Sequence, residues 1–169
     1  MKKMSLKPNQ IITLNDYPVY SDNVLCEYFQ KCKAGENVPL VPVIKKDIVV
    51  KHLGEVILQI FNKFEKSNPT AEYFMLDGTH RTTALNLSGC KIEVINLEKD
   101  EDLHEAKQFI STGQVQKDSI WDFSLIENFE LLNKHFQEKP FFMTVEQKTK
   151  KMVEEEILPD SLRIVCLEN

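Results

Sequence analysis

The chain lacks the features that mark several classes of protein. None of its apolar runs approaches the roughly 20 residues that a membrane-spanning helix needs. The basic start, Met-Lys-Lys-Met, has no apolar segment behind it, so we expect no signal peptide. Lys and Arg are spread along a chain whose formal net charge is −5, without the concentrated basic patch that DNA binding favours. We therefore expect a cytoplasmic protein with neither a membrane nor a specific nucleic-acid partner.

Cysteine and histidine are also sparse. The four residues of each type show no Cys-x-x-Cys pair and no zinc-site spacing; they are Cys26, Cys32, Cys90 and Cys166, and His52, His80, His104 and His135. In a reducing cytosol such cysteines stay free and are mostly buried. We predict no metal site made by these side chains.

What is present is typical of a globular α+β protein. The 169 residues are 42% hydrophobic and 28% charged, which suits one domain with a small C-terminal appendage. Alternation and turn clusters predict strands at 11–14, 38–45, 71–77, 91–97 and 162–167. Helical spacing and capping residues predict helices at 22–33, 47–64, 82–88, 102–111, 119–136 and 144–157. Pro39 and Pro42 favour an edge or bulged position for the second strand.

Residues 73–90 carry the most information. An apolar run ends at Asp77-Gly78, and a polar segment then leads into a short helix that Gly89 ends. A helix N-terminus attracts anions through its unpaired N–H groups and its dipole. Thr79, His80 and Arg81 would add a hydroxyl, an imidazole and a guanidinium, a combination that suits phosphate. The alternative is a plain turn in which Asp77 caps the helix and Arg81 pairs with a surface carboxylate.

The same segment resembles a known family. Asp77-Gly78-Thr79-His80-Arg81, followed by a small-residue helix and Gly89, is similar to the Asp-Gly-His-His-Arg signature of the ParB N-terminal/sulfiredoxin superfamily. Residues 33–43 resemble that family's helix end and Gly…Pro-containing strand, so the resemblance covers roughly residues 10–97. It implies a small mixed sheet backed by helices within residues 1–117, with a helical insertion at about 47–66 and a helical extension at 118–169. It also implies a nucleotide-phosphate site formed by residues 77–81 and Thr82.

Thr79 disfavours one branch of the superfamily. Sulfiredoxins use a cysteine at this position, and a hydroxyl cannot replace its thiolate. The acidic remainder after Lys117 shows no convincing helix-turn-helix, which disfavours the chromosome-partitioning branch.

The branch that remains contains stand-alone nucleotide-binding domains, among them free-serine kinases. This resemblance implies phosphoryl transfer from ATP or ADP (CTP is possible), with Mg²⁺, to a small hydroxyl substrate. Asp16, Asp22 and Glu36 are the candidate bases, although each also suits a cap or a solvated charge, and His80 is a candidate to stabilise the transferring group. A non-catalytic nucleotide-binding module and a ParB-like nuclease are the alternatives.

Overall fold

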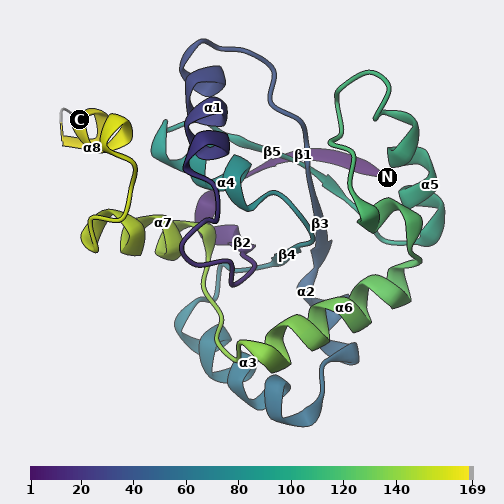
Figure 1. The fold of residues 1–169 in the computed structure, drawn as a ribbon. Helices are drawn as coiled ribbons and strands as arrows, with labels where there is room; N and C mark the ends of the chain where they lie inside the picture. Colours follow the sequence, from purple (N-terminus) through teal and green to yellow (C-terminus); the bar gives the residue numbers. More distant parts are fainter. Residues whose placement is uncertain (168–169) are drawn as a thin grey trace.

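A computed structural model describes residues 1–167 as a five-stranded mixed sheet with α-helices on both faces (Figure 1). The strand order is β1 (Lys2–Leu6), β5 (Ile92–Asn96), β3 (Val41–Lys45), β4 (Tyr73–Met75) and β2 (Ile11–Ile12). The outermost pair β1–β5 and the inner pair β3–β4 are antiparallel, whereas β5–β3 and β4–β2 are parallel. The predicted α+β class is confirmed.

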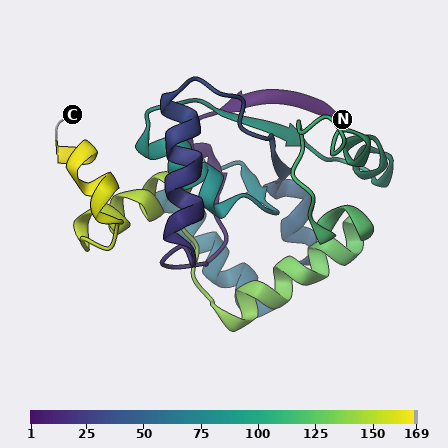
Figure 2. The same ribbon diagram turned by 45° about the horizontal axis from the view of Figure 1, so that its top comes forward.

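The two faces of the sheet carry separate apolar cores, because successive residues of a strand point to opposite faces. Phe74 on β4 packs toward α3 (Glu55–Ser67) and α6 (Leu125–Glu138). The next residue, Met75, belongs to the other core, which lies toward α1 (Asp22–Lys33), α4 (Thr79–Leu87) and α7 (Val145–Glu154). Figure 2 shows α1 running along α4 on that second face.

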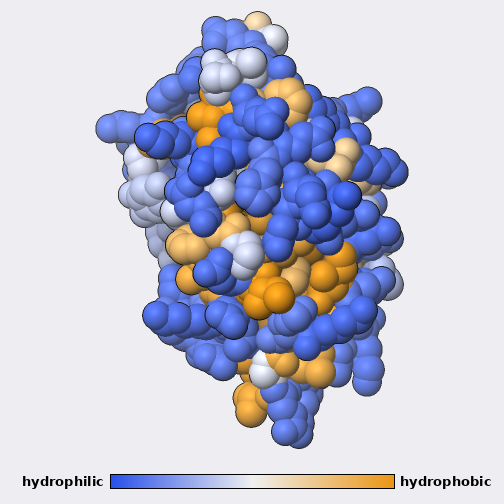
Figure 3. Space-filling model, turned by 90° about the vertical axis from the view of Figure 1, so that its right-hand side faces the viewer, coloured by the Kyte–Doolittle hydropathy of each residue, from blue (hydrophilic) through white to orange (hydrophobic). Residues whose placement is uncertain are grey.

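The remaining helices add to the cores on the two faces, with Val49 and Leu103 joining the Phe74 core and Leu162 packing with residues of α1 and α4. The short α2 (Lys46–Val49) follows β3 directly, α5 (Asp100–Gln108) follows β5, and α8 (Asp160–Leu167) ends the described chain. Figure 3 shows the side that carries α5, where hydrophilic surface surrounds a group of apolar side chains. None of the helices within residues 1–167 is long and apolar enough to cross a membrane.

The prediction of an edge or bulged position for the second strand was wrong, because β3 is the central strand. Val43 pairs with Met75, which puts Pro42 opposite Leu76, one residue beyond the end of β4. The Pro42 carbonyl accepts from the Leu76 N–H at 3.0 Å, so the N–H that Pro42 lacks would have bonded to the Leu76 carbonyl. Pro42 therefore costs the central strand one bond, at the very end of the β3–β4 ladder. The sheet also gains β1 at its edge, a strand that was not predicted because only Leu6 of its five residues is buried.

Two predicted helices are each divided in the structure. The predicted helix 47–64 consists of α2, a 3₁₀ turn (Val50–His52) and α3, with Gly54 as the extended N-cap of α3. The predicted helix 119–136 consists of a 3₁₀ turn (Ser119–Asp122) and α6, whose N-cap Ser124 forms a capping box with Glu127. In both segments the apolar spacing continues across the break, but a residue suited to an N-cap starts a new helix.

The prediction of a strand at 162–167 was also wrong, since this segment forms α8. The carbonyl of Pro159 accepts from the N–H groups of Leu162 and Arg163, and these bonds start the helix. A short apolar run cannot by itself be assigned to strand or helix, and here the preceding proline and Asp160 favour a helix start.

Candidate functional site

The predicted anion site is a strand-turn-helix unit whose helix begins earlier than expected. The prediction placed the helix at 82–88, but α4 starts at Thr79, immediately after its N-cap Gly78. The first intrahelical bond runs from the Thr82 N–H to the Gly78 carbonyl at 2.8 Å. The amides of residues 79–81 therefore have no acceptor within the helix, and no side chain caps this end. The signature segment (residues 77–81) thus supplies the N-terminal turn itself.

Gly78 makes this turn possible. Its φ is +117°, a value that side-chain-bearing residues rarely adopt, and a Cβ here would lie 3.2 Å from the Val41 Cγ1. Glycine is therefore required both for the backbone conformation and for the close approach of β3.

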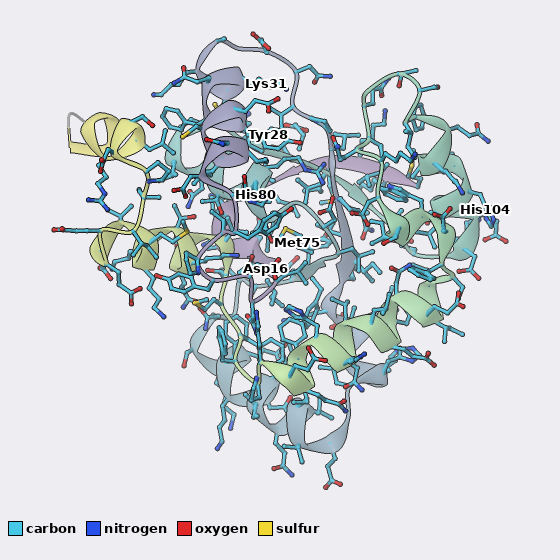
Figure 4. All side chains as sticks on the ribbon, viewed as in Figure 1. Asp16, Tyr28, Lys31, Met75, His80 and His104 are labelled. Atoms are coloured by element: carbon cyan, nitrogen blue, oxygen red, sulfur yellow. The ribbon has the colours of Figure 1, made fainter. Side chains whose placement is uncertain are left out.

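A polar cleft of about 340 Å³ opens at the N-terminal end of α4. The signature segment forms its base, and residues 116–118, in the connection after α5, form one side. The other side comes from Asp16 in the loop after β2, from Tyr20 just before α1, and from Tyr28 on α1. Figure 4 shows Asp16, His80 and Tyr28 following one another along this region, whereas His104 lies apart on α5.

Of the three predicted bases, the structure places only Asp16 in the cleft. The Thr79 hydroxyl donates to the Asp16 Oδ2 at 3.1 Å, which brings the acid directly to the start of α4. Asp22 is exposed in the first turn of α1, where Ser21 is the N-cap. Glu36 lies beyond the other end of α1, beside a separate hollow of about 220 Å³. Asp22 and Glu36 are therefore not placed to act on a ligand in the cleft.

Arg81 is held mainly by the protein. Its side chain is 3% exposed and forms an ion pair with Asp77. Its Nη1 donates to the carbonyls of Leu40 at 2.9 Å and Pro39 at 3.3 Å. Three of the five guanidinium N–H groups are thus used by protein acceptors, and Nε–H and one N–H of Nη2 make no further bond within the described residues. The plain-turn alternative, with Asp77 as a helix cap and Arg81 paired to a surface carboxylate, is not what the structure has: the two residues pair with each other in the wall of the cleft, and Gly78 is the N-cap.

Asp77 experiences opposing influences. Burial raises the pKa of its carboxyl above the usual range, the Arg81 cation opposes this rise, and the negative charge of Asp118 adds to it. Asp118 lines the same cleft as Asp77.

His80 is neutral in this setting. Burial lowers the pKa of its imidazole, and the Lys148 ammonium lowers it further. Its Nε2 accepts from the Ser21 N–H at 3.2 Å, so in the neutral ring the proton lies on Nδ1. The ring also meets Tyr20 edge-to-face, with the centroids 4.4 Å apart. His80 therefore offers a ligand a polar ring without a positive charge.

Thr82 does not join the cleft, in contrast to the prediction. Its side chain is 1% exposed, and its hydroxyl donates to the backbone carbonyls of Gly78 and Thr79 at 3.0 and 3.2 Å. Because α4 begins at Thr79, Thr82 already lies one turn into the helix and faces its backbone.

The loop that carries Asp16 is held by the C-terminal part of the chain. The N–H of Asn15 donates to His135 Nε2 at 2.9 Å, and its side-chain amide donates to the carbonyls of Lys139 and Phe141 at 2.7 and 2.6 Å. The Lys139 ammonium returns a bond of 3.0 Å to the Asn15 carbonyl. These contacts fix the residue immediately before the candidate base.

Lys148 completes this support from α7. The side chain is 1% exposed, and its ammonium donates to the Leu14 carbonyl at 3.2 Å. Burial lowers the pKa of Lys148 to about 8, an effect that the Asp16 carboxylate opposes. A buried cation thus lies behind the acid of the cleft.

Sequence reasoning missed Lys148, although the sequence carried a signal for it. Val145, Lys148 and Met152 fall at spacings of three and four, so the lysine occupies the buried stripe of α7. A lysine at an apolar position of an amphipathic helix is a candidate buried charge. Residues 116–118 gave no such signal, because a loop shows no periodicity.

Comparisons with known proteins add no further assignment. No family model, no curated protein and no solved structure matches the chain. Within residues 1–167 no group of three or more His, Cys, Asp or Glu side chains converges as a metal site.

Proposed function

We propose that this protein binds a nucleotide in the cleft at the start of α4 and transfers a phosphoryl group to a small hydroxyl substrate. The observation that carries the proposal is the Asp16–Thr79 contact of 3.1 Å, which joins a carboxylate to the N-terminal turn of a helix. Phosphoryl transfer needs an anion site, charge neutralisation and a base, and these two elements supply the first and the last. The resemblance of residues 77–81 to the ParB N-terminal/sulfiredoxin superfamily, and the mixed sheet behind them, support the same assignment.

In this proposal the phosphates lie against the unpaired amides of residues 79–81. The positive end of the helix dipole and the amide hydrogens favour the anion, and Gly78, which has no side chain, leaves room for it. Lys117 lines the cleft and adds a positive charge, and Arg81 adds its two remaining donors. The Thr79 hydroxyl can turn from Asp16 to a phosphate oxygen once the ligand is bound.

Asp16 is the proposed base. Its carboxylate would accept the proton of the substrate hydroxyl as that oxygen attacks the terminal phosphorus. Lys148 and Asn15 keep the loop in place, so that the base keeps its position relative to the helix start.

The residues present also suit Mg²⁺. Asp77 and Asp118 both line the cleft and offer carboxylate oxygens there. Mg²⁺ usually binds one or two carboxylates together with substrate phosphates and water. When bound, the ion neutralises phosphate charge.

Activity and binding can be separated by one matched pair of variants. We expect Asp16→Asn to keep nucleotide affinity within a few-fold of wild type and to lose at least about 100-fold in turnover. Asp22→Asn, in an exposed residue outside the cleft, serves as the control and should match wild type in both. The measurements are transfer of labelled phosphate from ATP or ADP to L-serine and other small hydroxyl compounds, and calorimetric titration of each nucleotide with Mg²⁺.

The same experiment distinguishes the alternatives. Nucleotide binding without transfer in wild type, over a broad set of acceptors, would favour the non-catalytic module. Equal turnover in Asp16→Asn and wild type would rule out Asp16 as the base. Failure of every nucleotide to bind or to raise the melting temperature would overturn the proposal as a whole.

A further inference from the structure

Tyr20 is unusually exposed for an aromatic side chain. It is 83% accessible to solvent, although it lies at the rim of the cleft. Its ring meets His80 edge-to-face, so it is anchored next to the first turn of α4. An aromatic ring with most of its surface free, beside a polar cleft, is available to a ligand.

Tyr20 belongs to a continuous wall. Val24 and Tyr28 follow it at spacings of four residues, and all three line the cleft. We call these three residues, two tyrosines with a valine between them, the aromatic wall. The face of α1 directed into the protein carries Leu25 and Phe29, and Tyr28 packs partly against the same core, whereas Tyr20 belongs to no core cluster of the described residues.

The cleft therefore has two chemically different parts. The helix start at residues 78–81 suits an anion, whereas the aromatic wall suits a flat apolar ring. His80 touches both, because it lies in the first turn of α4 and packs against Tyr20. A ligand that fills both parts carries a planar ring at one end and negative charge at the other, which is the chemistry of a nucleotide.

We propose that the aromatic wall is the nucleobase subsite of the cleft, with Tyr20 stacking on the base. This inference rests on the proposed function in one respect, namely that the phosphates of the nucleotide bind at the start of α4. Stacking uses the face of the base and tolerates any base, so the aromatic wall contributes affinity rather than a choice between ATP and other nucleotides. Tyr20 lies at the rim, so a base stacked on it covers the side of the cleft that is open to solvent.

Calorimetric titrations of ATP, tripolyphosphate and adenosine, all with Mg²⁺, test the subsite. In wild type we expect ATP to bind more tightly than tripolyphosphate. Tyr20→Ala should weaken ATP binding roughly tenfold and leave tripolyphosphate binding unchanged, whereas Tyr20→Phe should keep the wild-type affinity for ATP. Phe123→Ala is the matched control, since Phe123 is a partly exposed aromatic residue outside the cleft.

Each other outcome overturns one claim or the other. Equal affinities for ATP and tripolyphosphate, or an unchanged ATP affinity in Tyr20→Ala, would overturn the nucleobase subsite and leave the phosphate site intact. Adenosine binding that is lost in Tyr20→Ala, without binding of tripolyphosphate, would support the subsite and overturn the proposed phosphate site. Binding of none of the three ligands to wild type would overturn both.

Discussion

Lys148 places an ammonium group where almost no water reaches it. Its side chain is 1% exposed, and its pKa of about 8 lies below the 10.5 of an exposed lysine. Between these values the unfolded chain binds the proton more firmly than the folded protein does, so the free energy of unfolding rises with pH in this window. The charge is thus destabilising below pH 8, which is consistent with a residue retained for the site rather than for stability.

This gives a prediction for Lys148→Met. We expect the substitution to raise the free energy of unfolding at pH 7 by roughly 1–3 kcal/mol, because a buried charge is replaced by an apolar side chain of similar length. The gain should shrink at pH 10, where wild-type Lys148 is mostly neutral. Urea unfolding at both pH values checks this, with the exposed Lys150→Met as the control. A destabilised Lys148→Met at pH 7 would show that the Leu14 contact outweighs the burial of the charge.

A second prediction concerns Gly78. Gly78→Ala should lower the free energy of unfolding by roughly 1–3 kcal/mol, since φ is +117° and the new Cβ would approach Val41 too closely. Gly35→Ala is a useful comparison, because Gly35 also has a positive φ, of +69°, but has open space around its Cβ position. If both variants lose the same stability, the close approach to β3 contributes nothing.

At the scale of elements, the C-terminal helices and the Asp16 loop form one unit. The N–H of Thr13 donates to the Met143 carbonyl at 3.0 Å, Ile12 forms a β-bridge with Thr144, and Asn15 is bound by residues 135–141. The segment between α6 and α7 therefore runs alongside the loop that carries the base. The position of Asp16 depends on helices more than a hundred residues away in sequence.

The bonds of Asn15 allow a test of this dependence. Asn15→Asp would place carboxylate oxygens against the carbonyls of Lys139 and Phe141, so we expect a loss of roughly 2–4 kcal/mol in the free energy of unfolding. Asn15→Ala should lose less and should show reduced turnover with nearly normal nucleotide affinity. Urea unfolding and the transfer assay measure the two effects, with the exposed Asn62→Asp on α3 as the control. Wild-type stability in Asn15→Asp would contradict the described contacts.

At the scale of the whole molecule, the C-terminal extension is part of the core. Trp121, Phe129 and Phe136 belong to the same buried cluster as Phe74 of β4 and Phe61 of α3. The Phe74 and Phe136 ring centroids are 5.8 Å apart, in an edge-to-face arrangement. The first part of the extension, through α6, thus covers one face of the central sheet, whereas α7 packs on the other face and supports the site.

We therefore expect a chain ending at residue 117 not to fold. This truncation removes the aromatic residues of α6 and so exposes the Phe74 face of the sheet. It also removes Lys148 and His135, which hold the Asp16 loop. Circular dichroism and the dispersion of amide signals in NMR spectra measure the outcome. A cooperative thermal transition in residues 1–117 would show instead that the extension is a separate addition to a complete domain.

The sequence by itself determined the features that depend on near neighbours. Ser21 and the apolar spacing after it predicted α1, and Gly89, with its positive φ, ends the signature helix as expected. The strand-turn-helix at residues 73–88 was likewise predictable, because a glycine turn after an apolar run leaves few alternatives. Capping, turns and periodicity are all encoded within about a dozen residues.

Only the tertiary structure decided which distant groups meet. Asp16, Asp22 and Glu36 were equivalent in sequence, and Asp16 joins the cleft because the loop after β2 reaches Thr79, 63 residues away. The burial of Lys148 beside the Asp16 loop and the place of Pro42 in the central strand also depend on segments that are far apart in the sequence and pack together in the fold. Such pairings depend on the order of strands and on the helices that cover them, and no local pattern records either.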